Sequence, residues 1–276
     1  MKILRILALC PVWLIFLNLA VAVENGSLIS PNDPIAKSMV YVSTRGSACS
    51  GTLVANADKT KTYVLTAAHC VLYEGTLELR RNFEILFGIH PKNPEHMRKV
   101  SKVKLHPKEK LSESFILARR GYVTHDIALL EIEGDLPPGF IPAQIESLDH
   151  LGDHEIQIAG YGGPIALARQ GTLQLDERSI RKTFIFGRCF YSALHGIQKS
   201  EGAAIEAGDS GGPIFYVDDE GIVKIVAISS SRPTEFLIKI NAGLFYRAGD
   251  SYCTSIFDNW EWIQDILEIP RHPVKT

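Results

Sequence analysis

Short runs of β-branched, aromatic and aliphatic residues recur along this chain, and turn-forming residues separate them. No helical repeat lies between the runs, so nothing supplies the crossover helices that parallel βαβ units require. The pattern therefore predicts antiparallel β structure in two sets of strands. We expect the first set over residues 40–42, 49–54, 63–66, 83–88, 98–105 and 126–132. We expect the second over residues 155–159, 171–175, 182–191, 213–217 and 223–229, with one more at 236–240.

A proline-containing, polar segment over residues 134–152 divides the two sets and is the best candidate for a linker. One stretch near the C-terminus has helical periodicity instead, because its apolar side chains share one face. These side chains are Trp262, Ile263, Ile266 and Leu267. Asp258, with Glu261 three residues later, is expected to begin this helix as a capping box.

Residues 1–22 have the layout of a secretory signal peptide. Positive charge at the start is followed by an apolar run over residues 6–19 and by a small-x-small site that ends at Ala22. The run is short for a membrane span. We expect cleavage after Ala22 and a secreted protein, extracellular or periplasmic, without a membrane span in the mature chain. Lipid attachment at Cys10 is a weaker alternative, because Leu9 before it is large.

Cleavage after residue 22 would leave an even number of cysteines in an exported chain, which favours two disulfides. They are Cys49, Cys70, Cys189 and Cys253. Three pairings are possible, and spacing alone does not choose among them. The low number of cysteines favours a bacterial source over a eukaryotic one.

The charge of the chain and two of its local patterns argue against several classes of ligand. The formal net charge is −2 without a block of one sign, so no nucleic-acid surface is indicated. The glycine-rich residues 160–163 lack the Lys-Ser/Thr of a phosphate loop. Residues 149–155 hold two histidines among acids, but a solvated linker is favoured there over a metal site. We therefore expect no metal and no cofactor.

Residues 208–213 read Gly-Asp-Ser-Gly-Gly-Pro, a composition that suits a strained turn and disfavours a strand or helix interior. Such a turn can present the hydroxyl of Ser210 beside free backbone N–H groups. Acyl transfer needs both, a nucleophile and donors for the developing oxyanion. A plain glycine-rich hairpin with an incidental serine is the alternative.

A serine nucleophile needs a base within hydrogen-bond reach, and the base needs a partner that fixes its tautomer. His69 is the best candidate for the base, because an apolar strand and two alanines lead into it and Cys70 follows. Asp126 opens the apolar run 127–130, where a buried acid is costly unless it is paired. We expect His69 and Asp126 to pair.

The three motifs at residues 66–70, 126–130 and 208–213, in the order His, Asp, Ser, resemble those of the chymotrypsin/trypsin-like serine protease family. The resemblance implies two six-stranded antiparallel β-barrels and a C-terminal helix, with the active site in the cleft between barrels. It implies a first barrel within residues 23–140 and a second, with the helix, within 141–270. Ser210 would be the nucleophile, His69 the base and Asp126 its orienter, with the N–H groups of Gly208 and Ser210 as the oxyanion hole.

The resemblance also implies a disulfide between Cys49 and Cys70, beside the histidine. Cys189 and Cys253 would then either bridge on neighbouring strands or remain buried thiols. The new amine of Val23, released by signal-peptide cleavage, would fold inward onto Asp209, so that export itself activates the enzyme. Residues 23–37 as a disordered remnant of the leader are the alternative.

By the same resemblance, the primary specificity pocket would involve Ala204, Ile205, Ser230 and Arg232. Ala204 stands where an acid selects lysine or arginine, so we expect a non-basic, small or medium apolar residue before the scissile bond. The expected function is a secreted, monomeric serine endopeptidase acting on proteins or peptides. The alternative is a binding protein, latent or inactive, that needs a partner to order its pocket.

Overall fold

The computed structural model describes part of the 276-residue chain. The described residues are 22–44, 47–73, 82–107, 110–111, 123–148, 154–163, 166–173, 182–183, 187–188, 191–192, 202–231 and 251–271. The expected signal peptide before residue 22, the expected strand at 236–240, Cys189 and Arg232 lie outside them. Within the described ranges, no helix combines the length and the hydropathy needed to cross a membrane.

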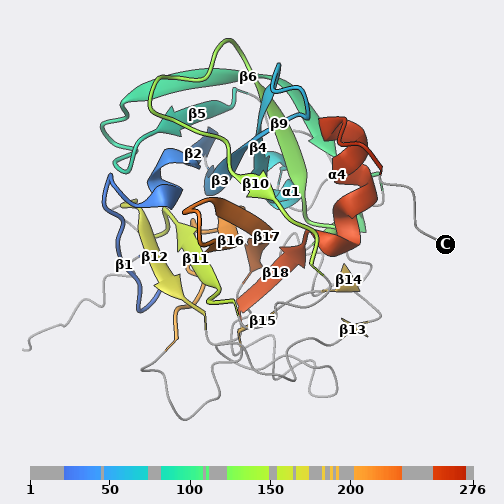
Figure 1. Cartoon of the computed structure of the whole chain (residues 1–276). Coiled ribbons are helices and arrows are strands. Elements are labelled where there is room, and N and C mark those ends of the chain that lie inside the picture. Colours follow the sequence, from blue (N-terminus) through green and yellow to red (C-terminus); the bar gives the residue numbers. More distant parts are fainter. Residues whose placement is uncertain are drawn as a thin grey trace, which may run out of the picture.

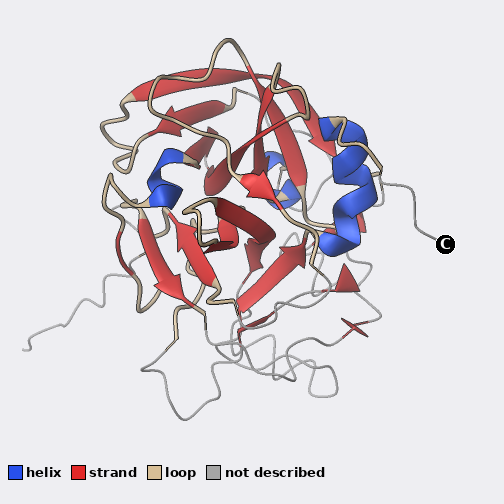
Figure 2. Ribbon diagram, in the orientation of Figure 1, coloured by secondary structure: helices blue, strands red, loops and turns tan. Residues whose placement is uncertain are grey.

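Six strands from the first half of the chain close into a barrel, and each of them pairs antiparallel with its neighbours (Figures 1 and 2). In barrel order they are β2 (Met39–Thr44), β3 (Ser47–Ala55), β4 (Thr62–Thr66), β9 (Ala128–Ile132), β6 (His96–Leu105) and β5 (Glu84–Phe87). Closure leaves no open edge, and apolar residues are buried on both faces of the barrel wall. Leu53 and Phe87 are fully buried on one face, and Leu65 and Leu129 on the other.

The second half forms an eight-stranded sheet below the barrel in Figure 1. Seven strands follow in the order β1 (Ser27–Leu28), β12 (Arg169–Thr172), β11 (Gln157–Gly160), β16 (Pro213–Val217), β17 (Val223–Ser231), β18 (Ser251–Ser255) and β15 (Tyr191–Ser192). The eighth, β10 (Gln144–Ile145), lies in the expected linker and pairs parallel with β17. Strand β1 joins this sheet although it precedes the barrel in sequence, so the chain's start and its second half pack together.

The remaining elements are short. Two small antiparallel pairs are β7 (Lys110–Leu111) with β8 (Val123–Thr124) and β13 (Lys182–Thr183) with β14 (Gly187–Arg188). Helical turns are η1 (Pro34–Lys37), α1 (Ala68–Val71), η3 (Phe257–Asn259) and α4 (Trp260–Leu267). The all-β class with a C-terminal helix, predicted from the sequence, is confirmed.

Two local predictions are wrong. A single strand was expected over residues 182–191, but β13 and β14 pair with each other, so the chain reverses within that range. Asp258 does not occupy the N-cap position of the terminal helix, because it lies inside the 3-10 turn η3 and α4 begins two residues later, at Trp260, with Asn259 as its N-cap. The side chain of Asn259 is turned to other partners and does not cap the helix either.

Helix α4 buries the face that the sequence predicted, with Ile263 and Leu267 almost fully enclosed. Its last turn accepts a hydrogen bond from the barrel, since the N–H of Ala57 donates to the carbonyl of Leu267 at 2.9 Å. Figure 1 shows the helix on the flank of the molecule, beside the barrel strands. A helix that follows the second sheet in sequence therefore braces the first barrel.

Candidate active site

His69 and Asp126 meet at the end of the barrel. His69 lies in α1, the single helical turn that follows β4, and Asp126 lies just before β9, the neighbour of β4. The ring Nδ1 of His69 is 2.8 Å from Oδ2 of Asp126, and the backbone N–H of His69 donates to Oδ1 at 2.9 Å. An ionised carboxylate only accepts hydrogen bonds, so Nδ1 carries the proton and Nε2 is left as the basic nitrogen.

Asp126 is buried, at 4% exposure, yet its environment favours the charged form. Burial by itself would raise the pKa of the carboxyl, but the nearby charge of His69 and hydrogen bonds from His69 and Ser230 outweigh it, so the pKa is lowered. The hydroxyl of Ser230 donates to Oδ2 at 2.5 Å. The family resemblance implied a place for Ser230 in the specificity pocket, and that place stays a prediction; the structure adds a contact of its hydroxyl with the acid.

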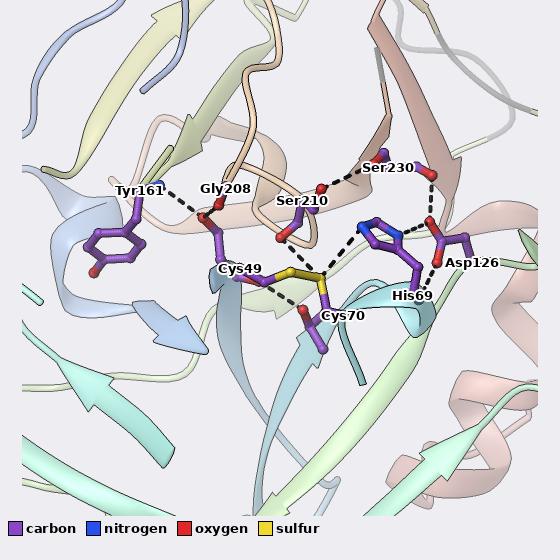
Figure 3. Close-up of a disulfide and its surroundings, with 10 residues drawn as sticks. Cys49, His69, Cys70, Asp126, Tyr161, Gly208, Ser210 and Ser230 are labelled. Atoms are coloured by element: carbon purple, nitrogen blue, oxygen red, sulfur yellow. Dashed lines mark hydrogen bonds and ion pairs between the residues drawn. A yellow bond between two sulfur atoms is a disulfide. The ribbon is translucent and has the colours of Figure 1, made fainter. Parts of the chain in front are cut away.

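Ser210 lies across from this pair, in the turn before β16 (Figure 3). Its hydroxyl donates to the carbonyl of Ser230 at 3.3 Å, and its own carbonyl is 3.6 Å from Sγ of Cys70. In Figure 3 the Nε2 edge of His69 is the edge that faces Ser210. Hydrogen bonds between nucleophile and base are often long or absent without substrate and tighten once it binds.

The turn also leaves backbone donors available. Among the described residues, the N–H groups of Gly208 and Ser210 donate to no other group of the protein. Gly208 has φ of 100°, a conformation that side chains with a Cβ rarely adopt. A Cβ there would also come within 2.8 Å of the Cα of Gly162. Glycine is therefore required at residue 208, and the turn can offer two N–H groups to an oxyanion beside the serine hydroxyl.

Asp209 points away from Ser210 and into the second sheet, with no exposed surface. Its Oδ2 accepts from the backbone N–H of Val23 at 2.9 Å and of Glu206 at 2.8 Å, and its Oδ1 accepts from that of Gly162 at 2.8 Å. Burial raises the pKa of this carboxyl to about 6, and these hydrogen bonds offset only part of the rise. The structure thus brings Val23 and Asp209 together across 186 residues of sequence.

Cys49 and Cys70 form the disulfide that the family resemblance implied. Cys70 follows His69 directly, so the bridge anchors the helical turn α1 to β3 of the barrel. Both sulfur atoms lie near the ring of His69, but their bond to each other leaves no thiolate there to hold a metal ion. Cys253 is buried in β18, and its proposed partner Cys189 lies outside the described residues.

Two other residues expected in the specificity pocket lie in the protein core. Ala204 and Ile205 are buried, and the backbone of Ala204 forms a β-bridge with Glu24 in the N-terminal segment. Arg232 lies outside the described residues. A pocket built from these residues stays a prediction.

Two residues that the sequence did not single out support the site. His125 precedes Asp126 and adopts a left-handed backbone conformation, with φ of 51°. Its ring stacks on that of His106, with 4.2 Å between the centroids, and its Nδ1 is 3.0 Å from Oδ1 of Asn259.

The second supporting residue is Ser50, which contacts the turn that carries Ser210. Neither had a local signal in the sequence, because its partners are distant along the chain.

Comparison with solved structures supports the fold class. The crystal structure of an inactivated protease paralogue from the scabies mite aligns with a TM-score of 0.59 and 18% sequence identity. The alignment covers 89% of this chain and 99% of that one. At this identity the match shows the fold alone, and it is consistent with the two-barrel fold of trypsin-like proteases.

Sequence comparison then gives the family. The family model described as Trypsin matches residues 29–243, which is most of the chain. The chain therefore belongs to the trypsin family. Venom serine protease 34 of Apis mellifera is 27% identical over an alignment of 188 residues, and the match covers 62% of this chain. The match spans 42% of the length of that relative.

Proposed function

We propose that the protein is a secreted serine endopeptidase that cleaves peptide bonds through an acyl-enzyme. One observation carries the proposal. A buried, charged Asp126 fixes the tautomer of His69, whose basic nitrogen faces the hydroxyl of Ser210 in a turn with two unused N–H groups. Membership of the trypsin family supports the same reaction class.

In the proposed mechanism, Oγ of Ser210 bonds to the scissile carbonyl carbon while its proton passes to Nε2 of His69. The carbonyl oxygen becomes an oxyanion, which the N–H groups of Gly208 and Ser210 stabilise. The carbon–nitrogen bond then breaks, and His69 returns the proton to the leaving amine. Water attacks the acyl-enzyme in the same way, giving its proton to His69 and releasing the carboxylic acid and the free serine. Asp126 stays ionised and stabilises the imidazolium that forms in each half.

Secretion and activation form part of the proposal. Cleavage after Ala22 would give Val23 a free amine at the position where its N–H now donates to Asp209. An ammonium there would pair with a carboxylate that has no exposed surface, so the turn at residues 208–210 would depend on the new N-terminus. The experiment is N-terminal sequencing of the active secreted protein. We expect it to begin at Val23, and a start well downstream would contradict this part of the proposal.

The preference before the scissile bond is proposed to be small or medium and apolar. Ala204 offers no charge at the position where relatives that cleave after basic residues carry an acid. A peptide-library profile should therefore show little cleavage after lysine or arginine. A profile dominated by either would overturn this preference.

A latent or inactive binding protein is the second candidate, and one observation favours it. The hydroxyl of Ser210 donates to the carbonyl of Ser230, which is not the arrangement of an activated nucleophile. Labelling with a fluorophosphonate separates the two candidates, because the reagent bonds to an activated serine and releases fluoride. An endopeptidase should label at Ser210 and lose the label in Ser210→Ala and His69→Ala. A correctly folded, mature wild-type chain that stays unlabelled would leave the binding protein as the better explanation.

A further inference from the structure

We propose that Ser50 is a positioning residue for the oxyanion hole, and this inference rests on the proposed peptidase function. Ser50 lies in β3 of the first barrel and has no exposed surface. Its side chain reaches the turn that carries Ser210, from the opposite half of the molecule. Ser50 makes four hydrogen bonds in this region, two through its side chain and two through its main chain.

The hydroxyl of Ser50 has one donor and one acceptor partner, and together they fix its orientation. The backbone N–H of Tyr161 donates to Oγ of Ser50 at 2.9 Å. Oγ in turn donates to the carbonyl oxygen of Gly208, also at 2.9 Å. Figure 3 shows the two contacts converging on one hydroxyl between the labelled Tyr161 and Gly208. Because the Tyr161 N–H occupies an acceptor site of the oxygen, the hydroxyl proton is directed to Gly208.

Gly208 needs such a partner because its own backbone does little to restrict it. Glycine populates positive and negative φ about equally, so steric exclusion does not select the orientation of its peptide groups. The preceding carbonyl, that of Ala207, accepts from the N–H of Gly163 at 2.9 Å. In the following peptide, the carbonyl of Gly208 accepts from Ser50 and the N–H of Asp209 donates to the carbonyl of Glu206 at 3.0 Å. The N–H proposed for the oxyanion hole lies between these two fixed carbonyls.

The main chain of Ser50 makes two further bonds that do not depend on its side chain. Its N–H donates to the carbonyl of Ser210 at 2.8 Å, and its carbonyl accepts from the hydroxyl of Thr66 at 2.8 Å. Both remain when the residue is changed to alanine. Ser50→Ala therefore removes the side-chain hydrogen bonds to Gly208 and Tyr161 while leaving the contact with Ser210 in place.

The loss should appear in the rate of acylation more than in substrate binding. Removing one oxyanion donor costs about 100- to 1000-fold in rate, and a donor that is present but poorly oriented should cost less, about 10-fold or more. Ser38→Ala is the matched control. Its hydroxyl is also buried in the first barrel and donates to a carbonyl, that of Ile141 at 2.7 Å, without a contact to the turn.

The test uses the full mature chain with p-nitrophenyl acetate, a small ester that needs no specificity pocket, and with a fluorophosphonate probe. For Ser50→Ala we expect kcat and the labelling rate to fall about 10-fold or more with KM nearly unchanged. For Ser38→Ala we expect wild-type values. Thermal unfolding reports the stability lost in each variant. If Ser50→Ala is destabilised but keeps wild-type kcat, the residue is merely structural and the proposal is overturned.

A second readout does not require activity. Hydrogen–deuterium exchange of peptides covering residues 206–212 should accelerate in Ser50→Ala and stay at the wild-type rate in Ser38→Ala. Unchanged exchange would overturn the positioning role. If the wild-type chain neither hydrolyses the ester nor labels, the peptidase proposal fails, and the exchange rates alone then decide whether Ser50 holds the turn.

Discussion

The prediction with the clearest magnitude concerns the N-terminus at Val23. When a residue precedes Val23, its nitrogen is a neutral amide that donates one hydrogen bond to Asp209. Burial then raises the pKa of Asp209 from 3.8 to about 6. One pKa unit corresponds to about 1.4 kcal/mol, so at neutral pH the folded chain loses about 3 kcal/mol by keeping this carboxylate ionised. A free ammonium at Val23 should cancel most of that loss.

The raised pKa of Asp209 determines how the stability of the extended chain depends on pH. In the extended chain the folded-state pKa of Asp209 lies above the unfolded value, so its contribution to stability is greatest below about pH 4 and is lost as the pH rises to about 6. In the chain that begins at Val23, the ammonium favours the carboxylate and removes this loss. The two forms should therefore differ most at about pH 7.5, where Asp209 is ionised in both, and least below about pH 5.

The assay compares a chain that begins at Val23 with one that retains residues 21–22, both carrying Ser210→Ala to prevent self-digestion. Urea unfolding gives the free energy of each form at about pH 5 and about pH 7.5. We expect the Val23 form to be more stable by up to about 3 kcal/mol at the higher pH. In Asp209→Asn the order should reverse, since the ammonium would then be buried without a counter-charge. Equal stability of the two forms at both pH values would refute the reasoning.

Three further predictions concern other parts of the site. Replacing the Cys49–Cys70 disulfide by two alanines should lower the unfolding free energy by about 3 kcal/mol, because the bridge closes a loop with a sequence separation of 21 residues. Chemical denaturation measures this loss. His125→Val should cost at least about 1–2 kcal/mol, because a left-handed φ excludes β-branched residues, and should slow fluorophosphonate labelling by displacing the neighbouring acid. Gly160→Ala should unfold the chain or abolish labelling, because its Cβ would lie 2.2 Å from Oδ1 of Asp209.

Each of these variants has its own control. Reduction should destabilise the wild type by about 3 kcal/mol more than the double alanine variant, which retains Cys189 and Cys253. His125→Asn should restore labelling, since asparagine tolerates the left-handed region and keeps a polar side chain. Gly221→Ala meets no atom within 4 Å, so despite its φ of 78° it should cost only about 1 kcal/mol. Wild-type labelling by Gly160→Ala would contradict the close approach of Asp209.

Much of the barrel was predictable because its signals are local. The apolar, β-branched and aromatic runs predicted the six barrel strands to within a few residues, since the residues that mark each strand are largely buried. The pairing of His69 with Asp126 also followed from sequence, because an acid that opens a buried strand needs a partner. The trypsin family was recognisable from three short motifs, and the comparisons confirm it.

What escaped prediction depends on contacts between distant segments. Ser50 lies in a run of small and apolar residues. Nothing around it reveals that its hydroxyl donates a hydrogen bond to the carbonyl of Gly208, 158 positions away. Asp258 has the local pattern of a helix cap, but tertiary contacts of the next residue shift the start of the helix. Strand β10 is two residues long and pairs parallel, so no periodicity could mark it.

The elements around the terminal helix contact the barrel that carries His69 and Asp126, so this barrel depends on residues translated much later in the chain. Asn259, directly before α4, accepts a hydrogen bond from His125 and donates another to the carbonyl of Ser255, while the end of α4 accepts one from Ala57. His69 and Asp126 are translated well before the residues of η3 and α4 that contact their barrel. A nascent chain that still lacks this stretch also lacks the support beside Asp126. The surroundings of Asp126 are therefore completed only after residues 257–267 have been translated.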